Sequence, residues 1–225
     1  MFAFRNQDQA KRWSPKRTVL LQLQRLTSVR DRLLLVREML AKPIQECKQF
    51  DTKEVFNAVK DASKKSLNAI KADIKDIERK ITETVKSDPS LNHLFELVTS
   101  VHGIGPVAAS QIIITTNEFK DIHDGKKYAC YCGVVPFEHS SGSSIRGRER
   151  VSHFANKKLK KLLHLAAVSI IRHPGEIKDY WERKIKEGKH KMVILNAIRN
   201  KLIQRVFAVV KRGSKYDRIY TNALA

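Results

Sequence analysis

The chain has 225 residues and carries 44 Lys and Arg against 23 Asp and Glu, a formal net charge of +21. This length is enough for one or two domains with a buried core, and a hydrophobic content of 42% excludes a generically disordered chain. The positive charge predicts a polyanionic partner, most often nucleic acid; an anionic membrane surface is the less favoured alternative.

Several other classes of protein are disfavoured by the sequence. No apolar run is long enough to cross a bilayer, and the opening residues MFAFRNQDQAKRW lack the apolar core of a secretory signal. The cysteines Cys47, Cys130 and Cys132 form no C-x-x-C pair, so we interpret them as reduced thiols and expect no zinc site. We therefore expect a cytoplasmic, nucleoid-associated protein with no membrane partner and no cofactor in this chain.

Residues 16–88 predict a helical hairpin. A Ser-Pro pair ending at Pro15 is a typical helix start, apolar residues then recur every three or four positions, and Pro43 is expected to break or kink the helix. A second segment, from Leu67 to Ile81, alternates apolar spacings of three and four, as a coiled-coil seam does. Two interpretations stay open: two long helices of an ordinary bundle, or an antiparallel coiled-coil arm that also dimerises.

The turn Gly103-Ile104-Gly105 separates two apolar segments that begin with Pro89 and Pro106, and this arrangement resembles a helix-hairpin-helix. Glycine accepts positive φ and lets a backbone come close to its partner, while the first N–H groups of the second helix attract an anion. Ile104 is expected to fill the space between the helices. The turn either grips a sugar-phosphate backbone without reading bases or forms a tight helical corner with no ligand.

A serine-rich segment precedes a basic one. Four serines surround Gly142: Ser140, Ser141, Ser143 and Ser144. A serine hydroxyl beside arginines suits phosphoryl transfer, because guanidinium groups clamp the phosphate and its developing charge. The alternative is an ordinary loop before a helix with a solvated lysine face. The candidate nucleic-acid-binding residues are Gly103, Ile104, Gly105, Arg146, Arg148, Arg150, Lys157, Lys158 and Lys161.

A last helix is expected from about Lys189 to Lys211. Its predicted core stripe consists of Val193, Ile194, Ala197, Ile198, Leu202 and Val206. Arg199, Lys201 and Arg205 fall outside that stripe, where they serve either solubility or contact with a nucleic-acid backbone.

Three stretches of the sequence carry a resemblance to a known family: VHGIGPVAASQIIITTNEFKDI, KKYACYCGVVPFEHSSGSSIRGRERVSHFANKKLKKLLHLAA and YWERKIKEGKHKMVILNAIRNKLIQRVFAVVKRG. Together they resemble the C-terminal transposase domain of the IS-one-ten insertion-sequence family, the serine-plus-DEDD recombinases guided by a bridge RNA. The resemblance covers roughly residues 95–212 and follows the same order along the chain.

The resemblance implies a component that excises and inserts a mobile DNA element. A serine in the Ser-Gly motif would form a covalent bond to DNA phosphate; the motif falls on Ser141, with Ser140 as the alternative. In the family, a coiled coil joins this domain to a RuvC-like domain whose acidic residues bind metal. Dimers and larger assemblies of such proteins hold DNA and a structured guide RNA.

The expected fold class is all-α: an antiparallel coiled-coil hairpin followed by a compact helical transposase domain that contains the helix-hairpin-helix. The expected segments are the end of a RuvC-like domain (1–15), the arm (16–88), the transposase domain (89–213) and a tail (214–225). Because no acidic RuvC-like domain precedes the arm, Mg²⁺ is expected only with that missing domain. We therefore expect this chain alone to bind nucleic acid and assemble, but not to recombine DNA. The alternative function is a non-catalytic nucleic-acid-binding and dimerisation module.

Overall fold

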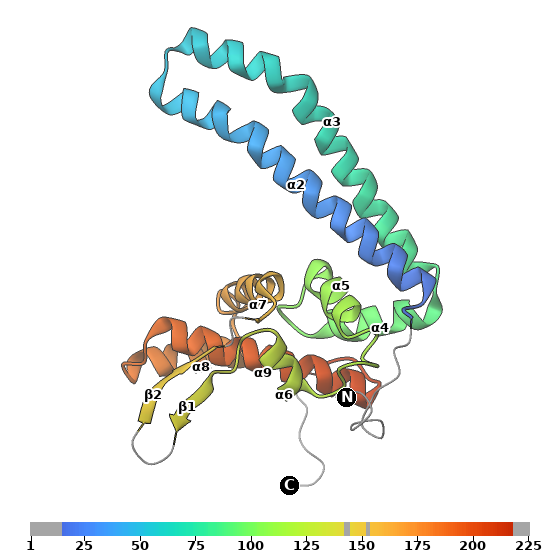
Figure 1. Cartoon of the computed structure of the whole chain (residues 1–225), viewed down its shortest axis with the longest axis vertical. Helices are drawn as coiled ribbons and strands as arrows, with labels where there is room; N and C mark the ends of the chain where they lie inside the picture. The colour runs from blue at the N-terminus through green and yellow to red at the C-terminus, as the bar shows by residue number, and fades with distance from the viewer. Residues whose placement is uncertain (1–14, 142–144, 152–153, 218–225) are drawn as a thin grey trace, which may run out of the picture.

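The computed structural model describes residues 15–141, 145–151 and 154–217, and it consists of a long arm attached to a compact body (Figure 1). The arm is formed by α2 (Thr18–Phe50) and α3 (Lys53–Lys86). The body contains α4 (Pro89–Ser100), α5 (Pro106–Thr115), α6 (Gly125–Tyr131), β1 (Phe137–Ser141), β2 (Ile145–Arg150), α7 (Lys157–Ile170), α8 (Glu176–Lys186) and α9 (Lys191–Arg212). Most of the predicted first segment (1–15) and tail (214–225) lies outside the described residues.

The helical hairpin predicted for the arm is confirmed, because α2 and α3 run back along each other from the body to the tip (Figure 1). Buried side chains lie near the body: Leu20 and Leu23 of α2 are fully buried, and Ile74 and Val85 of α3 are nearly so. Of the two outcomes expected at Pro43, the break is wrong, since α2 continues through that residue to Phe50, and the kink stays a prediction. A proline removes a single helical hydrogen bond, and the packing of α2 against α3 holds the remaining turns.

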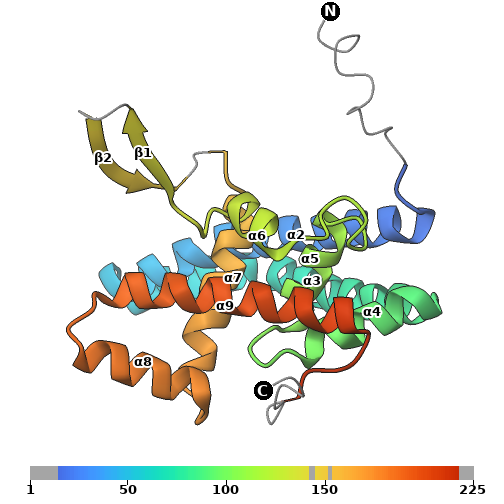
Figure 2. The same ribbon diagram turned by 90° about the horizontal axis from the view of Figure 1, so that it is seen from below.

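The core of the body surrounds α9, which packs against α4, α6, α7 and α8 (Figure 2). Ile194, Ile198, Leu202 and Val206 are buried as predicted. The buried face of α9 is turned relative to the predicted one, because Val193 is 61% exposed and Ala197 is exposed. The buried face instead includes Leu195, Arg199 and Ile203.

The described residues are α-helical except for one two-stranded antiparallel β-sheet, which corrects the all-α prediction for residues 137–150. Its two strands extend away from the body in both views (Figures 1 and 2). Ser140 pairs with Arg146 and Ser141 pairs with Ile145. This segment has too few apolar residues to pack as a helix. It forms a hairpin because hydrogen bonds across the ladder then give its backbone N–H and C=O groups their partners.

Candidate nucleic-acid interface

The Gly103-Ile104-Gly105 turn has one side packed against the body and one side open. Gly103 has φ of 94°, and a Cβ atom at this position would lie 3.2 Å from Cβ of Ile170 in α7. Ile104 is 4% exposed and fills the core, as the sequence predicts. A Cβ atom at Gly105 would meet nothing within 4 Å. Gly103 is therefore required for packing, whereas Gly105 leaves its backbone accessible.

The accessible side of the turn is the N-terminus of α5. Gly105 is its N-cap and supplies no side-chain oxygen, and Pro106 has no N–H group. The contrast with α4 is clear, because Asp88 caps that helix by accepting a hydrogen bond of 2.8 Å from the backbone N–H of Leu91. The first turn of α5 thus keeps free donors and the positive end of the helix dipole, which suits a phosphate.

The serine and arginine segment lies on the β-hairpin. Arg146, Arg148 and Arg150 occupy alternate positions of β2, whose pairing with β1 shifts register between Phe137 and His139. Across the ladder, Ser140 pairs with Arg146, and Ser141 pairs with Ile145. The structure therefore brings the two candidate serines and the three arginines into one element, which the sequence alone did not pair.

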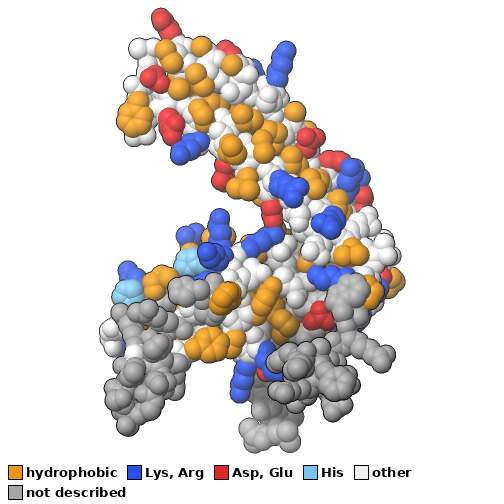
Figure 3. Space-filling view, viewed as in Figure 1, with side chains coloured by type: hydrophobic (Ala, Val, Ile, Leu, Met, Phe, Trp, Pro, Cys, Tyr) orange, Lys and Arg blue, Asp and Glu red, His pale blue; other side chains and the backbone are white. Residues whose placement is uncertain are grey.

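The lysines predicted for nucleic-acid contact lie at the start of α7. Asn156 caps this helix by accepting from the N–H of Leu159 at 3.1 Å. Lys157 and Lys161 are exposed and form no ion pair with any residue that the structure describes. Lys158 differs, because its ammonium group pairs with Asp31 of the arm. Figure 3 shows Lys, Arg and His side chains on the edge of the body that faces the arm.

Arg199 is a functional candidate that the sequence interpretation placed outside the core stripe. It is 4% exposed, and its guanidinium contacts Nδ1 of His164 at 3.0 Å and Oδ1 of Asn196 at 3.4 Å. Its Nε has no hydrogen-bond partner, and no carboxylate among the described residues pairs with it. Burial lowers the pKa of Arg199. Burial, and then the charge of Arg199, lower the pKa of His164. The sequence signal for this buried cation was the correct buried face of α9, which runs through Leu195, Arg199 and Ile203.

Within residues 15–141, 145–151 and 154–217, no group of three or more His, Cys, Asp or Glu side chains could hold a metal ion. None of the helices in the same ranges is long and apolar enough to cross a membrane.

Comparison with known proteins identifies similar sequences. Residues 95–182 match the family described as Transposase IS116/IS110/IS902 family. The chain is 27% identical to the pilin gene-inverting protein of Moraxella bovis over 147 residues, which are 64% of this chain and 45% of that protein. It is 24% identical to the transposase for insertion sequence element IS1111A of Coxiella burnetii over 139 residues, covering 60% of this chain and 37% of the relative.

The insertion element IS110 uncharacterized 43.6 kDa protein of Streptomyces coelicolor is 27% identical over 153 residues, which are 68% of this chain and 36% of that protein. The chain thus spans less than half the length of these relatives. The family match contains the Gly103-Ile104-Gly105 turn, the β-hairpin and α7, whereas Arg199 lies outside it.

Proposed function

We propose that the protein binds DNA and acts as a component of DNA recombination by an insertion sequence, because residues 95–182 match the IS116/IS110/IS902 transposase family and a transposase of Coxiella burnetii is similar to the chain. The pairing of the serine strand with the arginine strand carries the proposal. It supplies a hydroxyl and several cations in one element of a strongly basic chain, as binding and cleavage of a phosphodiester require.

The proposed nucleophile is Ser141, which precedes Gly142 in the Ser-Gly motif, with Ser140 as the alternative. Its Oγ would form a bond to phosphorus while the bond to the leaving deoxyribose oxygen breaks. The hydroxyl proton leaves to a base, and the departing oxygen takes up a proton. The arginines of β2 would offset the charge on the phosphate oxygens.

Duplex DNA and a structured guide RNA are the proposed partners of the open side of the turn, β2 and α7. The support is electrostatic: the first turn of α5 offers free N–H groups, and Lys157 and Lys161 have no partner among the described residues. Each of these groups recognises phosphate rather than base sequence, and both kinds of nucleic acid present phosphate.

The arm is the proposed site of self-association. Large apolar side chains are exposed along its distal part, with exposed fractions of 61% for Leu35, 72% for Met39 and 77% for Phe50. Apolar surface gathered on one element suits a second copy of the same arm. Whether α2 and α3 pack as a coiled coil stays a prediction.

Binding is tested by titrating duplex DNA and structured RNA with the protein across a salt series. We expect the logarithm of affinity to fall steeply with the logarithm of salt concentration. The Lys157→Gln/Lys161→Gln variant should reduce the magnitude of this slope for DNA by about 2, since each lost phosphate contact removes about 0.9. Lys42→Gln on the arm, where Lys42 pairs with Glu46, is the control and keeps the wild-type slope. Binding that is absent at low salt would overturn the proposal.

Catalysis is tested by incubating the protein with DNA carrying the element ends, together with a full-length relative, and isolating protein–DNA adducts that resist denaturant. Ser141→Ala is expected to abolish the adduct on this chain and Ser140→Ala to retain it. The reverse result assigns the nucleophile to Ser140. Intact DNA binding with no adduct on this chain favours the alternative, a non-catalytic nucleic-acid-binding module.

A further inference from the structure

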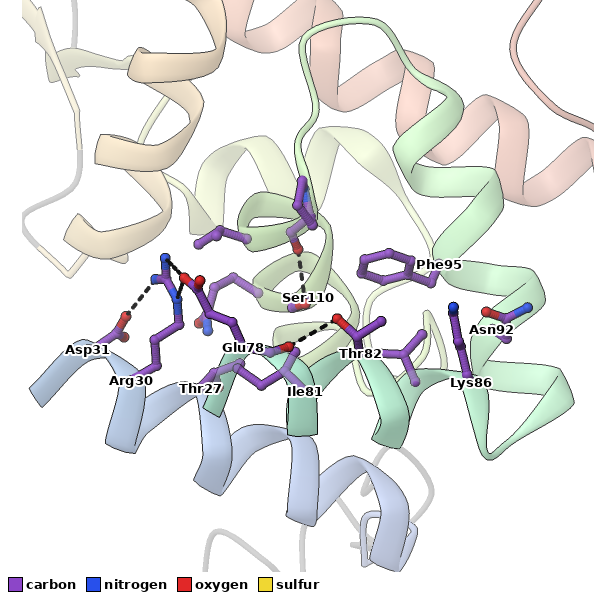
Figure 4. A pocket seen from close by; sticks show the side chains of 14 residues that line it. Thr27, Arg30, Asp31, Glu78, Ile81, Thr82, Lys86, Asn92, Phe95 and Ser110 are labelled. Atoms are coloured by element: carbon purple, nitrogen blue, oxygen red, sulfur yellow. Dashed lines mark hydrogen bonds and ion pairs between the residues drawn. The ribbon is translucent and has the colours of Figure 1, made fainter. Parts of the chain in front are cut away.

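A cavity of about 580 Å³ lies at the junction of the arm and the body (Figure 4). Its arm side is formed by α2 and α3, with Ile81 and Thr82, and its body side by α4 and α5, with Phe95 and Ser110. This volume falls within the range of small-molecule sites, which are mostly apolar with a few polar groups that fix orientation. Figure 3 shows the hollow between arm and body in which this cavity lies.

Gln111 is one polar residue of this cavity whose side chain has no partner among the described residues. It lines the cavity from α5 and is only 7% exposed, yet no hydrogen bond among the described residues uses its side-chain amide. Its polar neighbours are satisfied: Ser110 Oγ donates to the carbonyl of Pro106 at 2.9 Å, and Thr82 Oγ1 donates to that of Glu78 at 3.0 Å. Because the amide has both a donor and an acceptor that no described residue uses, it can pair with a ligand that presents the complementary groups.

The charges around the cavity favour an anion at one side. Pro106 and Val107 line it, so the uncapped N-terminus of α5 opens into it. Lys86 also lines it and forms no ion pair with any described residue. The carboxylates that line it are already neutralised, because Glu78 pairs with Arg30 at 2.8 Å and Asp31 pairs with Lys158. The remaining surface combines apolar side chains with one free amide.

We propose that this cavity holds a single unstacked nucleotide of the bound nucleic acid. The phosphate lies between Lys86 and the first turn of α5, and the base enters the apolar interior against Phe95. Gln111 hydrogen-bonds the base edge; its amide matches N6 and N7 of adenine, so an adenine is preferred. The inference rests on the proposed function, since the nucleotide belongs to nucleic acid that the protein already binds.

The combination of groups in the cavity favours this occupant over a side chain from a second copy. A nucleotide has an anion, a flat apolar ring and a donor–acceptor edge, and the cavity offers a partner for each. A protein side chain carries at most two of these features.

Binding to three duplexes, measured by fluorescence anisotropy at one salt concentration, tests the proposal: one fully paired, one with a single bulged adenine and one with a bulged thymine. We expect the wild-type protein to bind the adenine bulge about tenfold more tightly than the paired duplex, since stacking on Phe95 and hydrogen bonds from Gln111 both contribute. Gln111→Leu, of similar shape, is expected to reduce this preference to about twofold without changing affinity for the paired duplex. Gln45→Leu on the exposed face of α2 is the matched control and keeps the preference.

The outcomes separate this inference from the proposed function. Wild-type binding that is tight and equal for all three duplexes overturns the nucleotide site and leaves DNA binding intact. No binding to any duplex overturns both. Thermal melting establishes that Gln111→Leu is folded, and Lys86→Ala provides a second variant in which the bulge preference is expected to fall. A change in the oligomeric state of Gln111→Leu without nucleic acid assigns the cavity to a second copy and overturns the proposal.

Discussion

At the scale of single residues, the two glycines of the turn serve different purposes. Gly103 adopts positive φ beside Ile170, whereas Gly105 has φ of −82° and open space where a side chain would project. We expect Gly103→Ala to lower the free energy of unfolding by about 1–3 kcal/mol, because it adds backbone strain and a contact with α7. Gly105→Ala should cost about 0.5 kcal/mol, the loss expected for a poorer N-cap. Denaturant unfolding of both variants checks this, and equal losses would contradict the assignment.

The three cysteines differ in reactivity for a structural reason. Cys132 is fully buried, and burial raises the pKa of its thiol to about 12. Cys47 and Cys130 are half-buried. We expect a thiol reagent at pH 8 to modify two thiols in the folded protein and the third only after unfolding. Cys132→Ala should leave the count in the folded protein at two; three rapidly reacting thiols in the wild type would refute the prediction.

The sequence predicted Ile104 as a buried residue because apolar segments flank it on both sides. It did not predict Arg199, since a charged residue is normally assigned to the exposed face of a helix. The correct stripe on α9 runs through Leu195 and Ile203, one position from the predicted one, and Arg199 falls inside it. Several apolar residues on α9 allow more than one stripe, so packing against α7 decides which face is buried.

At the scale of elements, Arg17 connects three segments that are distant in the sequence. Its guanidinium donates to Asp88 at 2.6 Å, the residue that caps α4, and to Glu118 at 2.9 Å, which follows α5. Arg17 lies directly before α2 and is its N-cap. The side chain of Glu118 is 5% exposed, so the base of the arm contains a nearly buried carboxylate that depends on this arginine.

We expect Arg17→Gln to lower the free energy of unfolding at pH 7 by about 1–2 kcal/mol, a value reduced because the arginine is partly exposed. Hydrogen bonds from Arg17 lower the pKa of both Asp88 and Glu118. Carboxyls with a lower pKa in the folded state contribute stability above the unfolded pKa and lose it as pH falls through the folded pKa. The difference between wild type and variant should therefore shrink below about pH 4. Urea unfolding from pH 3 to 8 measures it, and a constant difference would exclude this origin.

The hairpin was missed because its composition is typical of a loop. Serine and glycine predominate between the strands, and each strand has only five or six residues. The starts of α4 and α5 could be predicted, because a proline at the first helical position is a local signal that needs no tertiary context.

At the scale of the whole molecule, an ion pair links the arm to α7 across the hollow between arm and body. Lys158 and Asp31 have side chains that are 43% and 35% exposed, so the pair contributes little to stability. We expect Lys158→Ala to change the free energy of unfolding by less than about 1 kcal/mol. It should nevertheless broaden the distribution of distances between spin labels on Cys47 in the arm and Cys130 in the body.

Exchanging the two residues, in Asp31→Lys/Lys158→Asp, should restore the narrow distribution. Lys160→Ala, on the same helix without an ion pair among the described residues, is the control. Pulsed electron spin resonance measures these distances. Distributions that are the same for Lys158→Ala and the wild type would show that helix packing alone fixes the direction of the arm.

The cavity lies where a small rotation of the arm produces a large movement of its distal end. It lies where α2 and α3 leave the body, and α2 extends for 33 residues, or about 50 Å at 1.5 Å per residue. A rotation of about 5° at the base displaces the far end by roughly 4 Å, because helices of this length transmit angular change as stiff rods. A group bound in the cavity at the base of the arm can thus move the exposed apolar tip. The tip itself lies far from the bound group.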